Sequence, residues 1–157
     1  MTTPSFEPIV HAAVDQVLRT QFRETAVALG STPEMPVGPG AWLHSSVAIF
    51  GQLSSDVVLS VPDELAGHLA ARMLSLPDGT PVDDSDKRDL AGEMCNMLAG
   101  RISEAFHSGG HFYDLGTPTV SRELSTGAAS PELLFSGTWQ CTGQTFSLAI
   151  HLRPTQA

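Results

Sequence analysis

Residues 84–110 read DSDKRDLAGEMCNMLAGRISEAFHSGG, and this stretch decides the fold. Its apolar residues recur at intervals of three and four, which predicts one long α-helix with a single face toward a core. Acidic residues stand at its start, where the helix dipole favours them, and Gly109 and Gly110 are expected to end it. The residues expected to face the core are Leu90, Met94, Met97, Leu98, Ile102, Ala105 and Phe106.

The side of this helix opposite the core carries a polar strip. At about 100° per residue, Asp89, Glu93, Asn96 and Gly100 fall within roughly 60° of one another. Glu93 and Asn96 place a carboxylate and a carboxamide one turn apart, so both can reach one external object. Gly100, one turn on, has no side chain to hold that object away. The alternative is a solvated strip without function. Asn96 argues against that alternative, because Asn is a poor helix former and an exposed helical position without a function more often carries Lys, Gln or Glu.

Composition and charge are those of one acidic domain. With 157 residues, of which 41% are apolar, the chain can build one core, so we expect a single domain over residues 1–157 with a Pro- and Gly-rich loop at 30–41. Eight basic residues against 17 acidic ones give a net charge of −9. This balance argues against nucleic acid or an anionic membrane as partner, and favours a protein partner or a cationic group. The chain has no basic leader followed by an apolar run, so we expect a cytoplasmic protein.

The rest of the chain predicts hairpins and two further helices. Short β-branched segments favour strands, alternating apolar residues favour a half-buried sheet, and Pro62 followed by two acids is typical of a helix start. The expected elements are a helix from Phe6 to Gly30, a hairpin of 44–50 and 54–61, a helix from Pro62 to near Leu76, a strand beginning at Pro118 after a loop, and a hairpin of 133–139 and 146–152 that turns at 141–143. The predicted fold class is α+β, with an antiparallel sheet built from hairpins and packed against helices.

Several acids near the start of the long helix could suggest a calcium loop. Counted from Asp84, however, Arg88 occupies the fifth ligand position, and Asp89 stands where the loop needs Gly. We therefore expect Asp83, Asp84, Asp86 and Asp89 to lie at the helix start and cap it.

Histidine and cysteine also offer no predicted metal site. His107 and His111 are four residues apart, but Gly109 and Gly110 between them spoil a shared helical face. Cys95 and Cys141 have no CxxC spacing and no His at ligand intervals, so both are expected to be reduced core residues.

Two segments and one proline resemble a known family. Residues 51–74 read GQLSSDVVLSVPDELAGHLAARML, residues 89–100 read DLAGEMCNMLAG, and Pro118 follows. Over roughly residues 42–152 the chain resembles the CheX branch of the CheC/CheX/FliY phosphatases of bacterial chemotaxis. That family carries an acid or Ser, then Glu, then Asn three residues after the Glu, and a later Pro; Asp89, Glu93, Asn96 and Pro118 match these positions. Ser54 departs from a second Gly that relatives often have in the hairpin turn. One copy of the motif resembles CheX, whereas CheC-like members have two.

The resemblance implies an activity. The family hydrolyses the aspartyl phosphate of a phosphorylated CheY-type response regulator. It implies that Glu93 and Asn96 are catalytic, that Asp89 and Gly100 contact the partner, and that the long helix presents this face. No cofactor of its own is implied, because Mg²⁺ is expected in the partner receiver domain. A homodimer joined through sheet edges is also implied. The alternative is a non-catalytic CheX-like module that binds a receiver or scaffolds a two-component or flagellar pathway.

Overall fold

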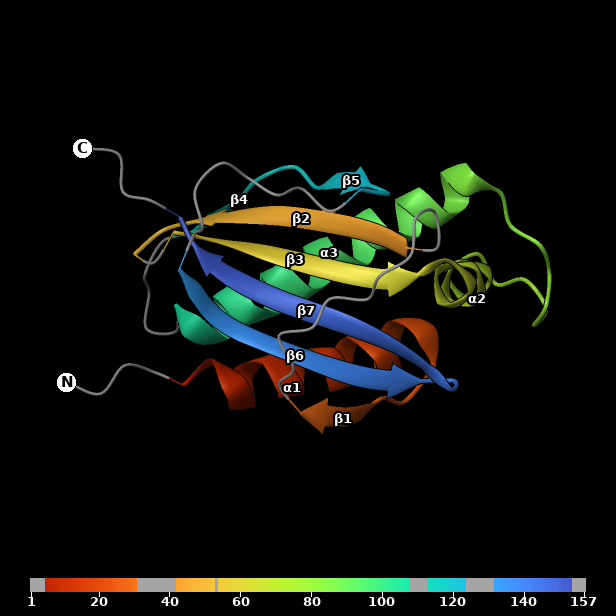
Figure 1. The fold of residues 1–157 in the computed structure, drawn as a ribbon, viewed down its shortest axis with the longest axis horizontal. Coiled ribbons are helices and arrows are strands. Elements are labelled where there is room, and N and C mark those ends of the chain that lie inside the picture. Colours follow the sequence, from red (N-terminus) through yellow and green to blue (C-terminus); the bar gives the residue numbers. More distant parts are fainter. Residues whose placement is uncertain (1–4, 31–41, 53, 108–112, 124–131, 154–157) are drawn as a thin grey trace.

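The fold is one antiparallel sheet with helices against one of its faces (Figure 1). The computed structural model describes residues 5–30, 42–52, 54–107, 113–123 and 132–153. In chain order the elements are α1 (Phe6–Val17), a π-helical turn η1 (Leu18–Phe22), β1 (Val27–Gly30), β2 (Trp42–Phe50), β3 (Ser55–Pro62), α2 (Asp63–Met73), α3 (Asp84–Phe106), β4 (Asp114–Leu115), β5 (Thr119–Ser121), β6 (Leu133–Cys141) and β7 (Gln144–Leu152). The strand order is β1-β6-β7-β3-β2-β4, and β5 also pairs with β2. Helices α1 and α3 lie behind the sheet in Figure 1, and α2 lies at one end of it. The predicted α+β class is confirmed.

Both predicted hairpins are present. β2 and β3 pair with Val47 opposite Val57, and the alternating residues Val57, Leu59 and Val61 are fully buried. The turn between β6 and β7 places Thr142 and Gly143 at φ 50° and 80°. Positive φ at both positions is the geometry whose twist suits a two-residue hairpin turn, and Gly adopts it without strain.

The first helix is shorter than predicted. A helix from Phe6 to Gly30 is wrong: α1 ends at Val17, and after η1 the backbone of Arg23 turns left-handed at φ 54°. Val27–Gly30 then forms β1, which pairs with β6. The pairing partner lies more than 100 residues away in the chain, so local spacing could not reveal this strand. The predicted loop at 30–41 lies almost wholly outside the described residues.

The second helix and the strand after α3 also differ in their limits. α2 begins at Asp63, one residue after the predicted start at Pro62, and it ends at Met73 and not at Leu76, because Ser75 adopts φ 58°. The strand predicted from Pro118 begins one residue later as β5, and β4 lies in a segment expected to be loop. The glycine stop predicted for α3 lies outside the described residues.

Helix α3 forms the centre of the core. It contacts α1, α2 and β2, and Leu90, Met94, Leu98 and Ile102 on its predicted inner face are buried. The assignment of Ala105 to that face is wrong, because Ala105 is exposed, and Met97 is only half-buried. The buried face is instead wider toward the small residues Ala91, Cys95, Ala99 and Ser103. At about 100° per residue, these small side chains lie along one flank of the apolar stripe. Within the described ranges, no helix combines the length and apolar character needed to cross a membrane.

Candidate functional site

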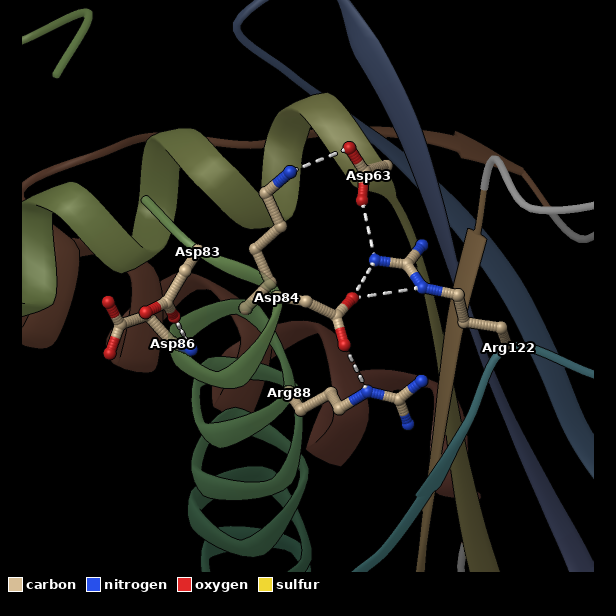
Figure 2. Close-up of polar contacts among 7 residues, drawn as sticks. Asp63, Asp83, Asp84, Asp86, Arg88 and Arg122 are labelled. Carbon is tan, nitrogen blue, oxygen red and sulfur yellow. Dashed lines mark hydrogen bonds and ion pairs between the residues drawn. The ribbon is translucent and has the colours of Figure 1, made fainter. Parts of the chain in front are cut away.

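The N-terminal end of α3 is held by a cluster of charged side chains (Figure 2). Asp83 caps the helix, since its carboxylate accepts a hydrogen bond from the Asp86 backbone N–H at 2.8 Å. Arg122, just after β5, donates through Nη2 to Asp63 Oδ1 of α2 at 2.8 Å and through Nε to Asp84 Oδ1 of α3 at 3.2 Å. Arg122 therefore ties β5 to the starts of both helices, and we call this set the Arg122 clasp.

The charges of the clasp shift the pKa values of its acids. Hydrogen bonds from Arg122 and then from Arg88 lower the pKa of Asp84 to about 2. The hydrogen bond from Lys87 Nζ, at 2.8 Å, is the main cause that lowers the pKa of Asp63. Both carboxylates are therefore ionised at neutral pH, and the described cations near the start of α3 are already paired.

Farther along α3, Asp89, Glu93 and Asn96 form no side-chain hydrogen bond or ion pair within the described part of the chain. Asp89 and Glu93 are exposed, while Asn96 and Gly100 are half-buried. The backbone beside them is closely supported: a Cβ added at buried Gly92 would lie 3.5 Å from Pro118 Cβ and 3.4 Å from Val120 Cγ2. Pro118, the proline that matches the motif, thus lies against Gly92, the residue before Glu93 in the chain. The structure brings Asp89, Glu93, Asn96 and Gly100 together on the solvent side of α3, and their roles remain predictions.

A groove of about 340 Å³ opens on one side of the polar strip. Residues of α1, η1 and the β4 region form one part of its lining, and α3 contributes Asn96, Met97, Gly100, Arg101 and Glu104. Tyr113 on one wall stacks on the buried ring of His107, with ring centroids 5.4 Å apart. Asn96 therefore stands at the edge of a hollow and not on a flat helix surface.

Sequence reasoning missed this groove and the clasp. Tyr113, Leu115 and Thr20 come to Asn96 from distant segments, and nothing local marks them. Only Arg101 could have been found from the sequence, because it lies on the same predicted helix, five residues after Asn96.

The cysteines and His107, the other residues considered for a site, are buried in the protein. Cys95 and Cys141 are free and buried, as predicted. The Cys95 thiol lies 3.5 Å from the carbonyl oxygens of Ser45 and Val57, and burial raises its pKa to about 12. His107 is buried, with Nδ1 3.0 Å from the Ser103 carbonyl oxygen. His111, which was not expected to share a helical face with His107, lies outside the described residues.

The chemistry open to the polar strip is limited and specific. A carboxylate and a carboxamide with free hydrogen-bonding groups can pair with a cation and orient a water molecule. The strip holds no cation or hydroxyl of its own, so a reacting group and its electrostatic stabilisation have to come from a partner.

Comparisons with known proteins show the family and the fold. Residues 44–133 match the family model described as chemotaxis phosphatase CheX. A chemotaxis protein CheX from Vibrio vulnificus has a similar structure, with TM-score 0.75, 16% identity, and coverage of 94% of this chain and 99% of that one. A CheX from Desulfovibrio desulfuricans matches with TM-score 0.73 and 17% identity, and the match covers 94% of this chain and 99% of that one. A structure described as the CheX-CheY-BeF3-Mg²⁺ complex from Borrelia burgdorferi matches with TM-score 0.66, 16% identity, and coverage of 96% and 99%. No curated protein matches the chain by sequence.

Proposed function

The chain belongs to the family of chemotaxis phosphatases described as CheX, and from that membership we propose that it binds a phosphorylated CheY-type receiver and hydrolyses its aspartyl phosphate. One observation carries the proposal: Glu93 and Asn96 stand on the solvent side of α3, unpartnered within the described residues, on a helix anchored at its start by the Arg122 clasp. The Borrelia burgdorferi complex supports a receiver as the class of partner.

Asn96 is proposed to orient the attacking water. Its carboxamide oxygen accepts a hydrogen bond from the water while its NH₂ group donates to the phosphoryl group, without adding negative charge beside a dianion. The water oxygen forms a bond to phosphorus in line with the P–O bond that breaks, and the aspartate carboxylate leaves. The water's protons go to the inorganic phosphate that is released. Orientation of this kind is the main contribution a protein makes to phosphoryl transfer, since the receiver's own Mg²⁺ and lysine hold the phosphoryl oxygens.

Glu93 is proposed to anchor the partner. A carboxylate next to a phosphoryl group is repelled unless a cation lies between them, so Glu93 fits a pairing with the receiver's active-site lysine. Asp89, one turn earlier, would touch the rim of the receiver's site, and Gly100 would allow close approach. Since the receiver works inside the cell, the proposal places this chain in the cytoplasm.

The proposal is tested by the decay of phosphate from receivers of the same organism, with and without this protein. We expect the wild-type protein to accelerate decay, Asn96→Ala to abolish the acceleration, and Glu93→Ala to reduce both docking and rate. Matched controls are Gln140→Ala and Glu64→Ala, which remove an exposed carboxamide on β6 and an exposed acid on α2. No acceleration with any receiver would refute the enzyme, and binding without acceleration would favour the scaffolding alternative.

We also infer that the protein forms a homodimer through a sheet edge. β1 lies at one end of the strand order, and its residues Val27 and Leu29 are 64% and 49% exposed. An apolar edge strand is a template for pairing with another strand. Light scattering should give twice the chain mass of 16.6 kDa, and Leu29→Lys should shift the mass toward one chain. A monomeric wild-type protein at micromolar concentration would contradict this inference.

A further inference from the structure

A second hollow continues the groove at Asn96 along the outer side of α3. It has a volume of about 460 Å³ and lies between α1 and α3, with Ile9 and Ala12 of α1 facing Arg101, Glu104 and Ala105 of α3. Arg101 and Glu104 line both hollows, so the two form one channel that begins beside Asn96. We call this channel the α1–α3 groove. Its lining is mostly apolar, and its charged lining residues are Arg101 and Glu104.

Arg101 differs from most cations of this chain. The chain has eight basic residues, and six of them form ion pairs with its own acids, namely Arg19, Arg72, Lys87, Arg88, Arg122 and Arg153. Within the described residues the other two, Arg23 and Arg101, form no ion pair, and both are exposed. On a chain with a net charge of −9, an unpaired arginine beside an apolar groove is available to an acidic partner group.

The size of a protein interface places Arg101 inside the proposed contact with the receiver. A standard interface covers about 800 Å² on each partner, which is a patch of roughly 16 Å radius. At about 1.5 Å of rise per residue, Arg101 lies roughly 7.5 Å along α3 from Asn96, and Glu104 roughly 12 Å. A receiver centred on Asn96 therefore covers the near half of the α1–α3 groove.

We propose that the α1–α3 groove is a second contact site for the same receiver, and that Arg101 selects receivers carrying an acidic side chain beside an apolar one on the flank of their phosphorylation site. This inference rests on the function proposed above. In this arrangement Glu93 would meet the partner's active-site lysine, as proposed above, and Arg101, on the groove side of α3, would meet an acid on the flank of that site. Guanidinium groups suit this task because they bind carboxylates in a fixed, bidentate geometry.

The experiment measures binding of a beryllofluoride-loaded receiver and turnover of the phosphorylated one. With a receiver that the wild-type protein dephosphorylates, we expect Arg101→Glu to raise Kd and KM about tenfold while kcat at saturation stays unchanged. The salt dependence of binding should also weaken, because one attractive charge is lost. A receiver whose flanking acid is changed to Lys should regain affinity for the Arg101→Glu protein.

The control is Arg23→Glu, which makes the same charge change at the other unpaired cation, a residue that lines neither hollow. Its Kd should stay within about twofold of wild type. Equal losses in both variants would mean a general effect of net charge and would overturn the role of Arg101. Wild-type Kd in Arg101→Glu, with acceleration intact, would overturn the inference while leaving the proposed phosphatase standing. A wild-type protein that binds no receiver would overturn both.

Discussion

Replacing Gly100 by Ala separates what α3 needs for folding from what it needs for partner approach. Gly100 lies inside α3, where Gly is less favourable than Ala by about 0.8–1.0 kcal/mol. A Cβ added there would meet Leu115 Cδ1 at 3.8 Å, which is an ordinary van der Waals contact. The methyl group therefore fits within the chain itself. We expect Gly100→Ala to raise the free energy of unfolding by about 1 kcal/mol, or Tm by about 2–4 °C.

The same methyl group projects into the groove beside Asn96, where the receiver is proposed to dock. A displacement of about 1 Å in a reacting pair can cost a factor of about 100 in rate. We therefore expect the more stable Gly100→Ala protein to accelerate phosphate decay at least tenfold less than wild type. Urea denaturation measures the first effect, and phosphate decay from the receiver measures the second.

Gly67→Ala is the matched control, because Gly67 is a glycine within α2 whose added Cβ would also meet only contacts of 3.4 Å or more. It should gain stability without losing activity. If Gly100→Ala is stabilised and fully active, Gly100 is not a point of partner approach. If it is destabilised, the described packing of α3 against β4 is wrong.

Two further predictions concern the clasp and the thiols. Arg122→Gln should lower the free energy of unfolding by about 1 kcal/mol at pH 7, since it removes the half-buried pair with Asp63. The pKa values of Asp63 and Asp84 are lowered in the fold, so this contribution to stability is complete above pH 3.8 and is lost as the pH falls toward about 2. Urea titrations of the wild-type and Arg122→Gln proteins should therefore converge near pH 2. A stability difference that widens on acidification would contradict the assignment. Burial raises the pKa of Cys95 to about 12 and of Cys141 to about 11, so neither thiol should react with a thiol reagent at pH 8 until urea unfolds the protein. Reaction of the folded protein at the rate of a free cysteine would refute that burial.

Periodicity predicted the parts of the fold whose signals are local. The spacing of Leu90, Met94, Leu98 and Ile102 identified α3, and alternation identified both hairpins. β1 was missed because its pairing with β6 is a contact between distant segments, and the end of α1 was missed because Arg23, not Gly, adopts the left-handed backbone. A strand of four residues has too little pattern of its own to oppose a neighbouring helical period.

The candidate site was predictable only on α3 itself. The angular spacing of Glu93 and Asn96 predicted both on the solvent side; in the structure Glu93 is exposed and Asn96 is half-buried. Tyr113 and Arg122 come from other segments, so the groove and the clasp depend on tertiary packing that no spacing rule encodes. Burial on α3 reached further than the apolar stripe, because small residues such as Ala91 and Ala99 let neighbouring elements approach closely.

The most direct test of the proposed chemistry is a paired measurement on Asn96→Ala with one receiver. The Kd for the beryllofluoride-loaded receiver reports docking, and single-turnover decay of its phosphate reports the reaction. If Asn96 orients the water, the Asn96→Ala protein should have a Kd within a few fold of wild type, and the decay rate should fall to that of the receiver alone. Undiminished decay, or a loss of rate explained wholly by lost binding, would contradict it.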